Sequence, residues 1–227
     1  MKEYQFAYGH GSVTVPLDEG SVLAVLHGND APAMQDIRAG LLESLAHPIG
    51  SNPLCEEIPA GASVALVVSD MSRFWMRQDL VVPHLVEYLH TACGVDYSKL
   101  TIVVANGTHT GGDEQELRTL VTSNVFDKVR VENHDCEAKD LVYLGTTAHD
   151  TPVWLNKTVA TADFVGCLGA CTHHIMAGFG GGRKSILPGV SGLQTIRHNH
   201  AYSLDPKALR SNPKIGNGVL TGNPLHE

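Results

Sequence analysis

The chain has 227 residues, of which 43% are hydrophobic and 18% charged, a composition typical of a soluble globular protein with one good core. The formal net charge of −8 argues against non-specific binding to nucleic acid or an anionic membrane, so any anion site must be local. The sequence contains no apolar run long enough for a membrane span, and its N-terminus lacks the apolar region of a signal peptide.

Short apolar runs alternate with segments of helical periodicity, and this alternation predicts an α/β fold. We expect a single domain with a Rossmann-like, mostly parallel sheet and flanking helices. The predicted strands are 21–28, 63–70, 100–107, 128–135 and 162–170, and a hairpin is predicted from 141–147 and 151–157. The predicted helices are 32–48, with Pro32 in the first turn, 79–92, with Pro83 in the first turn, 113–121 and 191–203.

The five cysteines are odd in number and scattered, which predicts reduced thiols in a cytoplasmic protein. Cys167 and Cys171 are four residues apart, but no second pair completes a zinc site. The remaining three are Cys55, Cys93 and Cys136.

Three polar loops follow three of the predicted strands. SDMSR (69–73) follows one strand, NGTHTGG (106–112) the next, and HHIMAGFGGGRK (173–184) comes after a third. Ligands of open α/β sheets bind outside the carboxyl ends of the strands, where loops after parallel strands meet. The sequence therefore predicts one ligand site built from all three loops.

Each loop also has a purely structural interpretation. The glycines of residues 178–182 match no standard phosphate-binding pattern, so a tight strand-to-helix turn is as good an interpretation as an anion cradle. Asp70 and Arg73 could form a local ion pair or bind a carboxylate or phosphate. His109 could be an exposed turn residue or a general acid or base.

Two pairs of histidines lie close together in the sequence. His173 and His174 cannot both face one site if the chain is extended there. His198 and His200 lie on different faces of a helix, so a metal would use one of them together with ligands from elsewhere.

These segments together resemble the N-terminal domain of the lactate racemase family that uses a nickel pincer nucleotide. The resemblance rests on SDMSR, NGTHT and HHIMAGFGGGRKSILPG, on a histidine sixteen residues past the lysine, and on the closing GNGVLTGNPLHE. It spans roughly residues 20–227 and keeps these segments in order and spacing.

The resemblance implies a cofactor and a role for several residues. The cofactor is a pyridinium mononucleotide whose two sulfurs and one ring carbon bind nickel. Lys184 occupies the position of the lysine that is joined to it covalently, and His200 that of the remaining nickel ligand. His109 and His174 match the two histidines that alternate as proton donor and acceptor on a small 2-hydroxy acid. The segment that contacts the nucleotide corresponds to Asp70, Met71, Ser72 and Arg73.

Two departures and the chain length set this sequence apart from the family pattern. Thr110 follows His109 where an arginine is common, and residues 71–75 lack the usual proline-containing turn. We expect residues 1–227 to form the cofactor-binding domain, with about 205–227 leading toward a C-terminal domain that this chain lacks. Expected partners are the substrate and cofactor-synthesis proteins, and the surface left bare favours a homo-oligomer.

Two other functions fit part of the same pattern. A binding module could hold a nucleotide or phosphate metabolite in these loops without turnover. A zinc-dependent hydrolase could use the histidine cluster, although the sequence contains no HExxH segment.

Overall fold

A computed structural model describes residues 1–29 and 31–226. The chain divides into two compact units, Met1–Gln35 and Asp36–Glu227. Within the described residues, no helix is both long and apolar enough to span a membrane.

The first unit is an antiparallel hairpin of β1 (Lys2–Tyr8) and β2 (Gly11–Leu17), followed by the short 3-10 helix η1 (Glu19–Ser21). Gly9 forms the tight turn with a φ of 56°. The strand predicted over 21–28 is wrong, because residues 22–28 pair with no strand among the described residues. Apolar composition alone cannot make a strand without a neighbour to accept its backbone hydrogen bonds. The alternating YQFAY and SVTV segments on either side of Gly9 were the overlooked strand signal.

The second unit is built on a four-stranded sheet in the order β5-β4-β3-β8. Its strands are β3 (Val64–Ser69), β4 (Leu100–Ala105), β5 (Arg130–Asn133) and β8 (Phe164–Leu168), and all three pairings are parallel. Five of the six β3 residues are buried, as expected for a strand covered on both faces. The predicted α/β class with a parallel sheet and flanking helices is confirmed.

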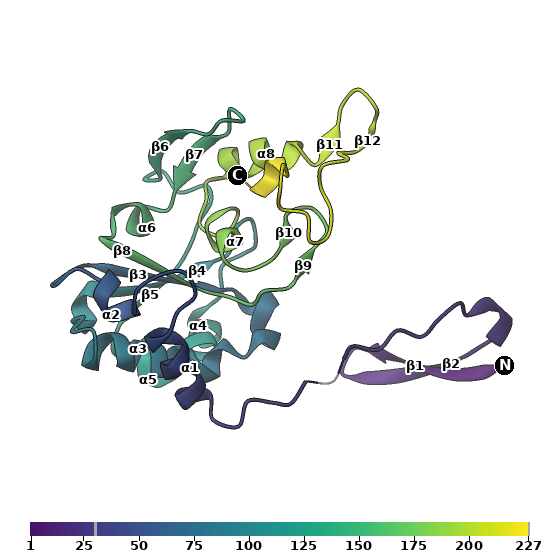
Figure 1. Cartoon of the computed structure of the whole chain (residues 1–227), viewed down its shortest axis with the longest axis horizontal. Helices are drawn as coiled ribbons and strands as arrows, with labels where there is room; N and C mark the ends of the chain where they lie inside the picture. Colours follow the sequence, from purple (N-terminus) through teal and green to yellow (C-terminus); the bar gives the residue numbers. More distant parts are fainter. Residues whose placement is uncertain (30, 227) are drawn as a thin grey trace. The chain divides into compact units, whose positions relative to one another are not determined.

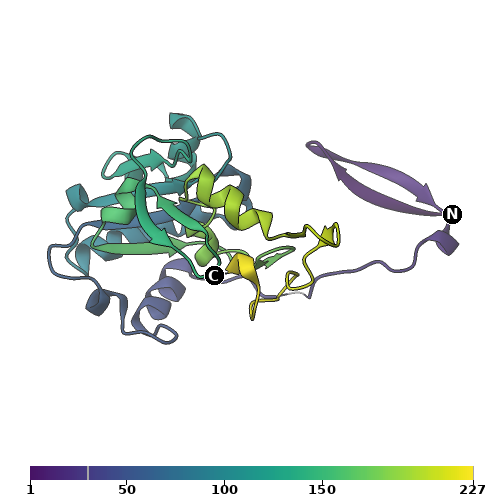
Figure 2. The same cartoon turned by 90° about the horizontal axis from the view of Figure 1, so that it is seen from above.

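Helices cover both faces of this sheet (Figure 1; Figure 2). On one face lie α1 (Ile37–Ala46), α3 (Val82–Thr91), α4 (Glu114–Val121) and α5 (Ser123–Phe126). On the other lie α6 (Lys157–Thr161), α7 (Arg183–Ile186) and α8 (Leu193–Ala201). Alternation along each strand supplies both layers: Leu66 and Val68 pack with the first group, Ala65 and Val67 with the second.

Helix α1 begins five residues later than predicted from Pro32, because Asp36 caps it by accepting a hydrogen bond from the Ala39 amide. Pro83 lies in the first turn of α3, as predicted. Helix α4 starts with a capping box in which Asp113 and Glu116 satisfy each other's backbone amides.

The predicted hairpin is formed by β6 (Val142–Thr146) and β7 (Pro152–Leu155), and α8 packs against β7. Two short antiparallel pairs follow: β9 (His173–His174) with β10 (Gly178–Phe179), and β11 (Leu204–Asp205) with β12 (Arg210–Ser211). Helix α2 (Leu54–Glu57) and the 3-10 helices η2 (Met71–Met76), η3 (Gln78–Leu80), η4 (Tyr97–Lys99) and η5 (Pro224–His226) complete the unit.

The prediction of five reduced thiols is wrong for one pair. Cys55 and Cys93 form a disulfide with their Cα atoms 4.6 Å apart, while Cys136, Cys167 and Cys171 are free. The pair lies 38 residues apart in the sequence, and only the packing of α2 beside the end of α3 brings it together.

Candidate active site

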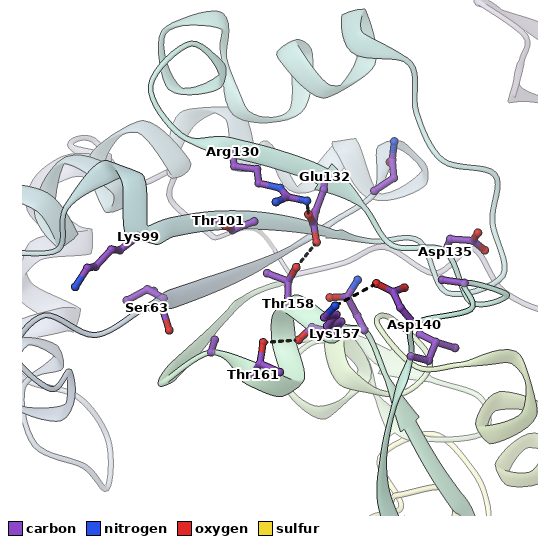
Figure 3. A pocket seen from close by; sticks show the side chains of 16 residues that line it. Ser63, Lys99, Thr101, Arg130, Glu132, Asp135, Asp140, Lys157, Thr158 and Thr161 are labelled. Atoms are coloured by element: carbon purple, nitrogen blue, oxygen red, sulfur yellow. Dashed lines mark hydrogen bonds and ion pairs between the residues drawn. The ribbon is translucent and has the colours of Figure 1, made fainter.

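A cavity of about 600 Å³ is lined by the starts of β3 and β4 and by residues of β5 and α6 (Figure 3). Four of its charged side chains form two ion pairs. Arg130 lies 2.7 Å from Glu132, whose other oxygen accepts a 2.6 Å hydrogen bond from Thr158, and Lys157 lies 3.9 Å from Asp140. We call this the paired-charge cavity; it contains none of the predicted site residues.

A second cavity, of about 400 Å³, lies at the carboxyl ends of the strands and is called the site cavity here. All three predicted loops line it. The predicted site residues that it brings together are Asp70, Arg73, His109, His174, Lys184 and His200. Met71 and Ser72 line a smaller adjoining cavity of about 210 Å³.

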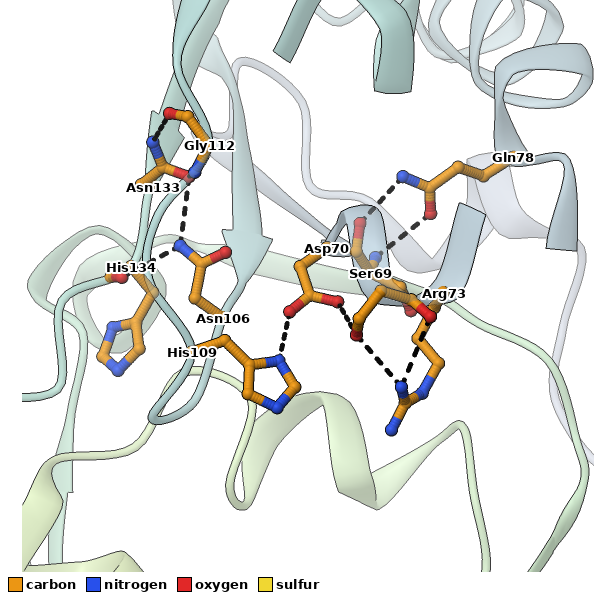
Figure 4. A network of polar contacts seen from close by, with 10 residues as sticks. Ser69, Asp70, Arg73, Gln78, Asn106, His109, Gly112, Asn133 and His134 are labelled. Atoms are coloured by element: carbon orange, nitrogen blue, oxygen red, sulfur yellow. Dashed lines mark hydrogen bonds and ion pairs between the residues drawn. The ribbon is translucent and has the colours of Figure 1, made fainter. Parts of the chain in front are cut away.

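Asp70 holds the imidazole of His109 (Figure 4). Its Oδ2 lies 2.5 Å from His109 Nδ1, and its Oδ1 accepts a 2.6 Å hydrogen bond from the Ser72 hydroxyl. Asp70 is buried, whereas the His109 side chain is 54% exposed. A carboxylate at Nδ1 favours the tautomer with the proton there, which leaves the Nε2 lone pair available to accept a proton.

Arg73 extends the same chain of contacts. Its Nη1 donates a 3.0 Å hydrogen bond to Ser72 Oγ, and it forms no ion pair with a carboxylate anywhere in the described residues. An unpaired guanidinium at the cavity can bind a carboxylate or phosphate.

Two amide side chains that the sequence analysis missed fix the ends of the strands (Figure 4). Gln78 is buried and exchanges hydrogen bonds of 2.8 and 3.2 Å with the backbone of Ser69. Asn133 bonds to both backbone groups of Gly112, and its Oδ1 also accepts from Asn106 at 3.1 Å. Neither residue carries a local sequence signal, because its role depends on a partner brought close by the fold.

The glycine-rich loop is shaped by close backbone approaches. A Cβ on Gly181 would lie 2.6 Å from the carbonyl oxygen of Ala170, and Gly178, with a φ of 84°, packs directly against Val219. The amides of Gly180, Lys184 and Ser185 donate within the loop or to Thr172. The geometry therefore supports the tight-turn interpretation of these glycines.

Residues near the C-terminus pack on this loop. The Gly218 amide donates to the Gly178 carbonyl at 2.9 Å, and the buried Asn223 side chain donates to the Met176 carbonyl at 2.8 Å. Arg183 donates a 2.8 Å hydrogen bond to the carbonyl of His226. These contacts belong to the segment from about 205 to 227, which the sequence predicted to lead toward a further domain.

His174 and Lys184 both line the site cavity and contact each other. Lys184 Nζ lies 3.0 Å from His174 Nε2, while His174 Nδ1 accepts from the amides of Met176 and Ala177 at 3.2 and 3.1 Å. Burial, followed by the charge of Arg73, lowers the pKa of Lys184. Burial is the main cause that lowers the pKa of His174. His173 also borders the cavity, but its ring packs 5.1 Å from that of Phe179, so only His174 contacts the lysine.

His200 approaches the cavity from α8. Burial is the main cause that lowers the pKa of its imidazole, so the neutral form that can ligate a metal is favoured near pH 7. Its Nδ1 is buried and makes no hydrogen bond of good geometry within the described chain. His198 lies elsewhere, with its ring 5.7 Å from that of Tyr202.

A nickel pincer nucleotide fits this donor set. The described residues contain no group of three or more His, Cys, Asp or Glu side chains arranged to hold a metal. A metal here would take His200 from the protein and its other ligands from a bound group, which is the arrangement that the sulfurs and carbon of a pincer cofactor supply.

Two curated proteins are similar to this chain in sequence. The lactate racemase of Thermoanaerobacterium thermosaccharolyticum is 25% identical over 100% of this chain and 52% of its own length. That of Lactiplantibacillus plantarum is 28% identical over 82% of this chain and 42% of its own length. The chain thus spans about half the length of these curated relatives.

Solved structures show the same fold. The lactate racemase apoprotein of T. thermosaccharolyticum matches with a TM-score of 0.82 at 24% identity, over 99% of this chain and 51% of that one. A Thermotoga maritima protein matches with a TM-score of 0.61 at 21% identity, over 84% and 44%. The family model described as the lactate racemase N-terminal domain matches residues 8–211, and the chain therefore belongs to this family.

Proposed function

We propose that this chain is the cofactor-binding half of a 2-hydroxy acid racemase or epimerase of the lactate racemase type. One observation carries the proposal: His109 and His174 come from separate loops and border one cavity together with Lys184 and His200. A racemase that accepts both enantiomers needs two proton-transferring groups on opposite sides of its substrate. The curated relatives are named lactate racemase, which supports this choice of reaction.

The two histidines take the hydroxyl proton of the substrate in turn. His109 is held by Asp70 with Nε2 as its accepting nitrogen, and the neutral His174 lies on the glycine-rich loop. Deprotonating the hydroxyl helps the Cα hydride to leave, and a planar 2-keto acid results. With a bound group to accept and return the hydride, the other histidine would reprotonate the oxygen from its imidazolium form and so yield the opposite enantiomer.

Lys184 and His200 hold the nickel pincer nucleotide in this proposal, Lys184 as a covalent tether and His200 as a nickel ligand. When bound, the cofactor supplies the acceptor for the substrate hydride. The segment Asp70, Met71, Ser72 and Arg73 borders the nucleotide, and Arg73 is placed to bind its phosphate or the substrate carboxylate.

A second domain is required to complete the site. The chain covers 52% and 42% of its curated relatives. Trp75, which lines the site cavity, is 61% exposed, and Ile175, between the lining residues His174 and Met176 in the sequence, is 71% exposed. We propose that the second domain covers them and adds substrate contacts, so the isolated chain racemises little. Self-association through this exposed surface, a cytoplasmic location and loading by cofactor-synthesis proteins are further parts of the proposal.

Intact mass spectrometry tests the central assignment. The chain is expressed beside cofactor-synthesis enzymes, and the native protein is expected to gain the mass of the cofactor. Lys184→Ala should remove this adduct, whereas the matched change Lys157→Ala in the paired-charge cavity should keep it. No adduct on the native chain, or an adduct that survives Lys184→Ala, would reject the tether.

Metal analysis of the same samples separates the two alternative functions. Nickel with a long-wavelength absorbance band supports the proposal, and zinc would favour a hydrolase. A protein that binds nucleotide without any metal would favour the binding module.

A further inference from the structure

The hydrogen bonds around His174 determine which of its nitrogens carries the proton. Nδ1 faces the amide hydrogens of Met176 and Ala177 at 3.2 and 3.1 Å, and an amide N–H can only donate. Nδ1 must therefore present its lone pair. A neutral imidazole then has its proton on Nε2, and an imidazolium would direct an Nδ1–H at two other N–H groups.

The same argument extends to Lys184. Its Nζ lies 3.0 Å from His174 Nε2. A lysine ammonium has three donors and no acceptor, so it would need a lone pair at Nε2 as well, which only an anionic imidazolate offers. An uncharged amine has a lone pair that can accept the Nε2–H. The geometry thus matches a neutral histidine donating to a neutral lysine.

The surroundings also disfavour a charged lysine. Lys184 is part-buried, and Arg73 acts on it as a neighbouring positive charge. The other titratable groups that line the cavity are Asp70, His109, His173, His174 and His200. Asp70 is the only carboxylate among them, and its oxygens are bonded to His109 and Ser72. No carboxylate in the described residues forms an ion pair with Lys184.

We propose that His174 positions Lys184 as a free amine before any cofactor is attached, by donating its Nε2–H to the Nζ lone pair. Only the uncharged amine is a nucleophile, so the loop presents a lysine ready for acylation at neutral pH. In this state His174 prepares the tether, and its proposed part in proton transfer would belong to the cofactor-loaded protein, in which Nζ is no longer a free amine. The use of this amine for cofactor attachment rests on the proposed function, whereas its uncharged state does not.

Nitrogen NMR of the unsubstituted chain tests the tautomer directly. Correlation of the imidazole nitrogens with the ring hydrogens, with His174→Gln used for assignment, is expected to show neutral His174 with the proton on Nε2 at pH 7.5. A proton on Nδ1, or an imidazolium, would overturn the proposal. The tautomer is read from the unsubstituted chain, and the variant serves only to assign the His174 signals.

Competitive acetylation tests the amine. Trace acetic anhydride is added between pH 6 and 11, and modification of each lysine is read by peptide mass spectrometry. Nζ attacks a carbonyl carbon, acetate leaves and the amine loses a proton, so the rate follows the uncharged fraction. The rate of each lysine at pH 7.5 is expressed as a fraction of its own rate at high pH. This fraction is expected to be at least tenfold larger for Lys184 than for the exposed Lys157.

Two variants separate the role of His174 from burial alone. His174→Gln keeps a polar side chain of similar size but offers a carbonyl that can accept from an ammonium, so the Lys184 profile should move at least tenfold toward that of Lys157. His173→Gln, its sequence neighbour, should leave the profile unchanged. An unchanged profile in His174→Gln, or a native profile equal to that of Lys157, would reject the proposal.

The outcome is independent of the proposed reaction. An early-titrating Lys184 that nevertheless gains no cofactor would reject the tether and leave the free amine standing. A cofactor tethered to a chain whose Lys184 titrates like Lys157 would support the tether and reject the free amine.

Discussion

The site cavity and the paired-charge cavity differ in what their polar groups already contact. The paired-charge cavity is larger, at about 600 against 400 Å³, yet its Arg130, Glu132, Lys157 and Asp140 are joined in ion pairs. In the site cavity Arg73 lacks a carboxylate partner, and one histidine nitrogen, Nε2 of His174, faces a lysine amine. Cavity volume alone therefore does not identify the candidate site. Polar groups that can still bind a ligand identify it better.

The largest expected difference between the two cavities concerns the Asp70 carboxylate, which is bonded to Nδ1 of His109. Asp70→Asn keeps the size of the side chain but can donate to Nδ1, which favours the wrong tautomer. We expect racemisation of a 2-hydroxy acid to fall about 10²–10⁴-fold, the usual contribution of a positioned base. The assay uses the cofactor-loaded chain joined to the second domain proposed above.

Glu132→Gln in the paired-charge cavity is the matched control for Asp70→Asn and should leave the rate within a factor of about two. Equal losses in both variants would show that the comparison of the two cavities is unfounded.

A smaller effect is expected from the packing of the glycine-rich loop. Gly178→Ala places a methyl group against the Val219 carbonyl at a φ of 84°, whereas at Gly182 the new methyl meets nothing within 4 Å. We expect about 2–4 kcal/mol of lost stability for the first change and about 1–2 kcal/mol for the second, where only the φ of 50° is unfavourable. Urea unfolding of both variants measures the difference, and equal losses would show that residues near 219 do not pack on the loop.

A pH effect is expected at His134, whose carbonyl accepts from Asn106 of the site cavity while its sequence neighbours line the paired-charge cavity. Burial lowers the pKa of this imidazole, so the folded state binds fewer protons than the unfolded one. The contribution of His134 to the free energy of unfolding is therefore fully present above about pH 6.5. It falls as the pH drops through the ordinary pKa of histidine.

His134→Gln keeps a donor for the Ser191 carbonyl but does not titrate. Urea midpoints at pH 7.5 and 5.5 should differ less in this variant than in the native chain. The same loss on acidification in both proteins would exclude His134 as a source of the pH dependence.

The smallest effect is expected in the paired-charge cavity itself. The Lys157–Asp140 pair is 3.9 Å long, and its side chains are 63% and 68% exposed. Lys157→Ala should change stability by less than about 0.5 kcal/mol, because water screens such pairs. A loss above 1 kcal/mol in urea unfolding would mean that these charges do more than neutralise each other.

The core of the fold could be predicted because its signals are local. The β-branched runs that form β3 and β4 and the helical patterns of α3 and α4 each identify their own element, and parallel pairing follows from their alternation. The error over 21–28 came from the same rule, since a strand also needs a partner that composition does not reveal. The Cys55–Cys93 disulfide was missed for a similar reason.

The candidate site could be predicted to the level of its loops but not of its contacts. Position after parallel strands was enough to bring Asp70, His109 and His174 to one cavity. The resemblance assigned Asp70 to a nucleotide but did not indicate that its carboxylate holds His109, and Gln78 and Asn133 had no signal at all.

By itself, the sequence determined the parallel α/β architecture, the three loops that share one edge and the identity of the groups on them, because strand order along the chain and residue chemistry are local properties. Only the tertiary structure decided how those groups are bonded. It set Asp70 against His109, turned Nδ1 of His174 toward two amides and brought Lys184 to its Nε2, since hydrogen-bond partners are fixed by packing between distant segments.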